Sequence, residues 1–154
     1  MFCRILMVIA VTFLSGCVSQ YYVQDVDAIL RDSPKIDLLV KEKPAPRTAA
    51  ENIEAYYFWW NPLTRPDAVK NWKEIFVMGE SSSPAWTYTA IAKIAVAQRR
   101  RDDISAMKIL RSLARDLGGD ALIDLRRDPM IDNPKFDSRI LGYRYLATVV
   151  RKDP

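Results

Sequence analysis

Five aspartates recur at short intervals between residues 120 and 137. Carboxylate oxygens are the ligands that Ca²⁺ and Mg²⁺ prefer, so Asp120, Asp124 and Asp128 are the candidate ligands of a metal- or anion-binding module in an Asp-rich loop over 120–137. Their spacing does not match the alternating aspartates and glycine of calcium-binding loops. Arginines lie in and beside the same segment. We therefore favour a solvated loop with surface ion pairs and predict no metal site.

The residue types that most hydrolytic enzymes need are missing. Histidine is absent, which removes the serine-histidine, cysteine-histidine and zinc-histidine mechanisms. The serines at 81–83 lack a lysine at the spacing of a Ser-Lys pair. Both cysteines, Cys3 and Cys17, lie within the first 17 residues, so the body of the protein has no disulfide framework. We predict a protein that is not an enzyme and that uses no cofactor.

An aromatic run at residues 56–60 has three interpretations. It is core if it covers a sheet, and we favour this reading. Because Trp and Tyr dominate protein interfaces, Tyr57, Trp59 and Trp60 are the candidate contacts of a protein partner. The run is also typical of an aromatic belt at the level of lipid headgroups. With a period of two, Tyr57 and Trp59 share one face, and Trp60 lies on the other.

The N-terminus reads as a targeting segment. Arg4 precedes an apolar run at 5–14, which is too short to cross a bilayer as a helix but suits a signal peptide. The run ends in Leu-Ser-Gly-Cys at 14–17. This resembles the lipobox of bacterial lipoproteins. The resemblance implies a signal peptide over 1–16, cleavage before Cys17, and acyl chains on Cys17 that anchor the protein in a membrane.

The same resemblance implies a compartment. Position 18 is Val and not Asp, which by resemblance to lipoprotein sorting favours the outer membrane, with the protein facing the periplasm. That compartment excludes nucleic acid as a partner. Removal of Arg4 with the signal leaves 22 basic against 19 acidic residues, a small surplus that does not indicate a polyanion partner.

Composition patterns then predict the elements that would position these residues. Gly118 and Gly119 end a helix that Asp102 or Asp103 caps, and its apolar residues recur at spacings of three and four. The other expected elements, in chain order, are a tether at 17–35, a strand at 36–40, a linker at 41–50, strands at 74–78, 85–97 and 120–126, a polar loop at 127–138 and a strand at 139–151.

The order β-β-α-β-β predicts an α+β fold. Its one main helix would cover a mainly antiparallel sheet in a two-layer sandwich, with residues 36–73 as an N-terminal extension. In the strand at 139–151 both faces are fairly apolar, so the second face needs a cover as well. We expect the extension to supply this cover, and a homo-oligomer is the other option.

Several short motifs carry a further resemblance over about residues 74–151. They are Ile75, Val77, Pro84 and the run 88–94 in the first strands, Ala106, Leu110, Ala114 and the run 117–125 in the helix and third strand, and Gly142, Tyr143 and the run 147–150 in the last. These motifs resemble the YbjQ/RcsF-like superfamily of bacterial envelope proteins. The resemblance implies the α+β fold and a role as an envelope adaptor or a stress-sensing or assembly protein that binds an envelope protein.

Overall fold

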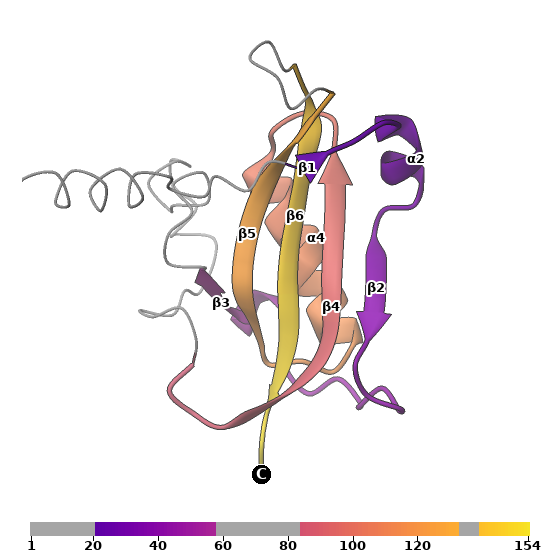
Figure 1. Ribbon diagram of the computed structural model, residues 1–154. Coiled ribbons are helices and arrows are strands. Elements are labelled where there is room, and N and C mark those ends of the chain that lie inside the picture. Colours follow the sequence, from indigo (N-terminus) through magenta and orange to yellow (C-terminus); the bar gives the residue numbers. More distant parts are fainter. Residues whose placement is uncertain (1–20, 58–83, 133–138) are drawn as a thin grey trace, which may run out of the picture.

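The computed structural model describes residues 21–57, 84–132 and 139–154 (Figure 1). They form one sheet in the order β1-β5-β6-β4-β2, in which β3 also pairs with β5. One long helix, α4, covers one face of the three central strands (Figure 1). The elements are β1 (Tyr21–Tyr22), α2 (Val26–Arg31), β2 (Lys35–Leu38), η1 (Ala50–Asn52), β3 (Glu54–Tyr57), β4 (Tyr88–Gln98), α4 (Asp103–Asp116), β5 (Ala121–Ile131) and β6 (Ile140–Lys152).

The centre of the fold is a split β-α-β unit. Strands β4 and β5 both run antiparallel to β6, which lies between them, and α4 connects the two outer strands. At the edges β2 is antiparallel to β4, whereas β1 and β3 are parallel to β5. The predicted α+β fold, with one main helix on a mainly antiparallel sheet, is confirmed. The predicted strand at 74–78 lies outside the described residues.

Helix α4 begins and ends where the sequence indicates. The Asp102 side chain accepts a hydrogen bond from the Ser105 N–H at 2.9 Å and caps the first turn. Gly118 follows the last turn with a φ of +76°, a conformation that glycine adopts without steric cost. A Cβ at this position would lie 2.3 Å from the Pro44 carbonyl oxygen, so the linker at 41–49 packs closely against the end of the helix.

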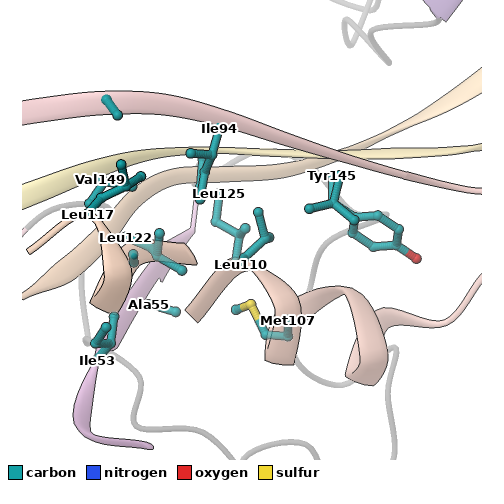
Figure 2. Close-up of a cluster of buried hydrophobic side chains, with 14 of the residues drawn as sticks. Ile53, Ala55, Ile94, Met107, Leu110, Leu117, Leu122, Leu125, Tyr145 and Val149 are labelled. Atoms are coloured by element: carbon teal, nitrogen blue, oxygen red, sulfur yellow. The ribbon is translucent and has the colours of Figure 1, made fainter. Parts of the chain in front are cut away.

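The main core lies between α4 and the sheet (Figure 2). Met107, Leu110 and Ala114 of the helix are buried against side chains of all three central strands. The N-terminal part of the chain contributes Ile53 and Ala55, which are fully buried in the same cluster. The described end of the expected extension, at residues 53–55, is therefore part of this core.

A β-bulge divides β5 into two halves and reverses which of its alternating side chains face α4. Ile123 pairs with Thr148 and Arg126 with Leu146, so two residues of β5 face one residue of β6. Asp124 occupies the bulge with a φ of +53°, a conformation in which Asp and Asn are enriched. Because of the bulge, Leu122 and Leu125 both join the core beneath α4. Regular alternation along the strand at 120–126 would place Ala121, Ile123 and Leu125 on one face, and the bulge moves Leu125 to the other.

A buried ion pair joins the second half of β5 to the start of α4. Nη1 of Arg127, whose side chain is 2% exposed, lies 2.6 Å from each carboxylate oxygen of Asp103. The Tyr145 hydroxyl donates to the same carboxylate at 2.8 Å, and the Arg127 guanidinium lies 5.6 Å from the centre of the Tyr143 ring. Burial and the hydrogen bond to Asp103 raise the pKa of Tyr145. The phenol therefore stays protonated and acts as a hydrogen-bond donor to Asp103.

Three expectations about the remaining segments need correction. The polar loop was expected from residue 127, but β5 continues to Ile131 because β6 on one side and β1 on the other both supply strand partners. The tether was expected to reach residue 35, but β1, α2 and the start of β2 already lie within 21–35. Strands β2 and β3 extend the sheet at its edges, so the described part of the extension does not lie across the second face.

Replacement of Asp103 by alanine tests the buried ion pair. We expect a loss of about 3–5 kcal/mol in the free energy of unfolding, because Arg127 stays buried while its carboxylate contact disappears. The matched control is Asp116→Ala on the same helix, where the side chain is 54% exposed and an effect within about 0.5 kcal/mol is expected. Urea unfolding measures both, and equal effects would contradict the assigned role of Asp103.

Replacement of Gly118 by alanine tests the packing of the linker on the helix end. The added Cβ would meet the Pro44 backbone in a conformation that costs an L-residue about 1–2 kcal/mol without any contact. We expect a total loss of more than about 2 kcal/mol in urea unfolding. Lys108→Ala, on the exposed face of α4, is the control. If Gly118→Ala unfolds at the same urea concentration as the control, the linker does not pack here.

Candidate functional site

The first of the candidate acidic ligands, Asp120, holds three parts of the chain together. Its carboxylate accepts hydrogen bonds from Arg47 Nε at 3.0 Å, from the Thr48 hydroxyl at 2.6 Å and from the Lys152 N–H at 2.9 Å. Burial raises the pKa of Asp120, but these hydrogen bonds outweigh burial and bring the pKa from 3.8 down to about 2. Asp120 thus fastens the linker to the C-terminal end of β6.

The other aspartates of the predicted Asp-rich loop are spread over strand β5 and its end. Asp128 is 2% exposed, and its carboxylate lies 3.6 Å from both Arg126 and Arg144. Asp132 accepts a hydrogen bond from the Arg139 N–H at 2.9 Å. Asp124 is exposed at the bulge, and Asp137 lies outside the described residues. The described part of the segment is therefore mainly a strand, and the expectation of a loop is wrong for residues 121–131.

The structure does not bring these carboxylates together. Asp120, Asp128 and Asp132 each pair with arginine, so the expected solvated loop with surface ion pairs is confirmed in the arginine pairing but is wrong in the loop and in the exposure of Asp128. Within residues 21–57, 84–132 and 139–154, no group of three or more His, Cys, Asp or Glu side chains could hold a metal ion. The arrangement is suited to fixing strands and loops in place, and it offers no common centre for a cation.

The face of the sheet opposite α4 carries a shallow hollow of about 360 Å³. It is lined by Lys93 of β4, Leu146 and Thr148 of β6, and Asp124 and Arg126 of β5. The lining has charges of both signs, and the Arg126 charge already faces Asp128. This surface can contact polar groups, but its geometry does not select one class of ligand.

The aromatic run reaches the described part of the chain only at its start. Tyr56 is 6% exposed, packs with Ala121, Ile123 and Val150, and donates a hydrogen bond to Glu54. The core interpretation is thereby confirmed for Tyr56. Tyr57 is the last residue of β3 and pairs with Leu125, while Trp59 and Trp60, like Cys17, lie outside the described residues. The partner-contact interpretation of these aromatic residues stays a prediction.

The strongest candidate for an interaction site is one that the sequence predicted as a strand only. We define the β2 edge as residues 35–39, which lie beyond β4 at the right of the sheet in Figure 1. All four residues of β2 are exposed, and Ile36, Leu38 and Leu39 are 43%, 49% and 47% exposed. These side chains are half of the large exposed apolar residues that the described part of the chain contains.

The backbone of the β2 edge has a defined orientation. The Leu39 N–H donates to the Ile91 carbonyl of β4 at 2.8 Å. In an antiparallel pair, alternate residues direct both backbone groups toward the partner strand, so Lys35 and Asp37 face β4 in the same way. Ile36 and Leu38 therefore direct their N–H and C=O groups away from the sheet. A sequence signal existed, since Lys-Ile-Asp-Leu alternates charged and apolar residues in a short strand after Pro34.

Comparison with models of protein families, with curated proteins and with solved structures finds no match for this chain. In the part of the chain that the structure describes, no helix has both the length and the apolar character needed to cross a membrane.

The pKa of Asp120 predicts an acid-dependent loss of stability. A carboxyl group with a lowered pKa stabilises the fold above its unfolded value near 3.8, and this contribution disappears as the pH falls toward about 2. We expect about 1–2 kcal/mol after allowance for solvent screening of Arg47, which is 43% exposed.

The measurement is urea unfolding of the wild type and of Asp120→Asn between pH 2 and pH 7. The variant should be less stable at pH 7, and the difference should vanish near pH 2. Asp116→Asn is the exposed control. A difference between wild type and Asp120→Asn that stays constant across this range would contradict the assigned hydrogen-bond network.

Proposed function

We propose that this protein is a lipid-anchored protein of the bacterial outer membrane that faces the periplasm and acts by binding protein rather than by catalysis. Its role would be that of an envelope adaptor or of a stress-sensing or assembly protein. The single observation that carries the proposal is the β2 edge, where outward backbone groups that have no strand beside them among the described residues occur on the same strand as exposed apolar side chains.

An edge strand of this kind is suited to β-augmentation. A partner strand that adds to the sheet satisfies the outward N–H and C=O groups of Ile36 and Leu38, and it covers their side chains at the same time. Soluble proteins usually block free edges with charges, bulges or covering loops, because bare edges pair with other chains. Among the described residues, β2 carries two charged side chains, but both lie on the face opposite Ile36 and Leu38.

The anchor is supported by the Leu-Ser-Gly-Cys sequence at 14–17. Acyl chains contribute about 0.8 kcal/mol for each buried CH₂ group, and more than one chain gives stable anchoring. A protein confined to a membrane meets its partner at a raised effective concentration, so a short binding strand can be sufficient. Anchor and edge strand thus support the same mode of action.

Replacement of Cys17 by serine tests the anchor. In bacterial cells the wild-type chain should fractionate with the membrane, and its N-terminal peptide should carry the mass of the acyl groups. Cys17→Ser should lose that mass and leave the membrane fraction. The control is Cys3→Ser, which should behave as the wild type because residue 3 is removed with the signal. Equal fractionation of wild type and Cys17→Ser would contradict lipidation.

Site-specific photo-crosslinking tests the binding edge. A photoreactive phenylalanine analogue at Leu38 should yield a discrete protein adduct in intact cells, because this side chain is 49% exposed on the β2 edge. The same analogue at Lys108, on the exposed face of α4, is the matched control. If both positions give the same adducts, or if neither gives one, the β2 edge is not the binding surface.

A further inference from the structure

The β2 edge is complementary to itself, and we propose that its occupant is β2 of a second copy of this chain. The two strands would pair antiparallel about a two-fold axis that passes between the two copies of Ile36. This inference rests on the proposed function, because it names the partner of the edge strand proposed there to bind protein. Backbone orientation, charge and apolar surface support this register independently.

Backbone orientation sets the position of the axis. Ile36 directs its N–H and C=O away from β4, as shown by the Leu39 N–H bond to Ile91 and the pairing of Ile36 with Ile94. Two copies of Ile36 can therefore exchange both backbone hydrogen bonds. Two residues further along, the Leu38 N–H reaches the Pro34 carbonyl of the second copy. Pro34 has no N–H to donate, so the pairing ends there.

Charge complementarity selects this register over its neighbours. With Ile36 opposite Ile36, each Lys35 lies opposite an Asp37 of the second copy, and these pairs occur twice because the interface is isologous. They occupy the non-hydrogen-bonded positions, where side chains on adjacent strands lie closest. A shift that placed Asp37 opposite Asp37 would set like charges together.

The exposed apolar side chain of Ile36 also lies at the proposed two-fold axis. The side chain of Ile36 lies on the face of Ile94, which is part of the core beneath α4. Pairing two copies at Ile36 would cover side chains that are 43% exposed and would continue the apolar layer across the axis. Four residues on each side make a small interface by comparison with stable dimers. We therefore expect the pairing to depend on confinement in the membrane.

Cysteine crosslinking in membranes tests the register on the full chain. Ile36→Cys should form a disulfide-linked dimer under mild oxidation, because paired residues across two antiparallel strands lie about 5.5 Å apart. Leu38→Cys is the matched control, since it is equally exposed on the same face. In this register the two copies of residue 38 lie four residues apart along the strands, which is too far for a disulfide.

Charge exchange tests the complementarity. In the Ile36→Cys chain, Lys35→Asp alone and Asp37→Lys alone should each slow dimer formation about tenfold, because each creates two like-charge pairs. The double variant Lys35→Asp with Asp37→Lys should restore the original rate. All of these side chains are exposed, so circular dichroism should show an unchanged fold. A double variant as slow as the single ones would overturn the proposed pairing, and so would equal crosslinking at residues 36 and 38.

The controls separate this inference from the proposed function. A disulfide-linked dimer of the wild-type chain would show a free thiol at Cys17, which contradicts the anchor and with it the membrane confinement on which the pairing depends. An Ile36→Cys adduct with a different protein would overturn the pairing with a second copy and support a partner of another kind. Absence of any adduct at residue 36 would overturn the pairing with a second copy, whereas the proposed function is tested by the photo-crosslinking at Leu38, which needs no thiol on the partner.

Discussion

The ion pair between Arg127 and Asp103 fixes the geometry on which the rest of the fold depends. Arg127 stands on the central sheet and Asp103 in the first turn of α4, so the pair sets where the helix starts over the strands. A buried pair carries a large desolvation cost and is weak evidence for stability alone. Here it is joined by Tyr145 and packed beside Tyr143, which gives the carboxylate and the guanidinium partners with defined directions. Its main effect is to specify one position of the helix.

The two sides of the sheet differ in what lies beside their outermost strands. The outer side of β5 is occupied by two short parallel strands, β1 at one end and β3 at the other. Asp120 and Gly118 then hold the linker between β2 and β3 against the end of α4 and the end of β6. On the other side the described chain ends its sheet at β2, whose outward backbone groups have no strand beside them among the described residues. The proposed binding surface lies on that side.

The sequence was informative where a local rule decides the structure. The caps of α4 at Asp102 and Gly118, and the long strands β4 and β6, follow from side-chain chemistry within a few residues. The phase change in β5 could not be predicted by alternation, although the three-residue spacing of Leu122 and Leu125 with Asp124 between them is a signal for a bulge. The pairing of β1 and β3 depends on a distant strand with which they have no local relation. The exposure of β2 likewise follows from tertiary contacts.

The position of β1 sets how far the protein can stand from its membrane. On the proposed lipidation, Tyr21 is the fourth residue after Cys17, and a chain of that length spans at most about 14 Å. Tyr21 pairs with Met130, so the proposed anchor would hold the β5 side of the sheet near the headgroups. The β2 edge lies four strand spacings from β1, which is about 19 Å across the sheet. A connection this short would keep the domain close to the membrane surface and would restrict its rotation. On the proposed lipidation, a molecule that binds β2 would therefore itself have to lie close to the bilayer.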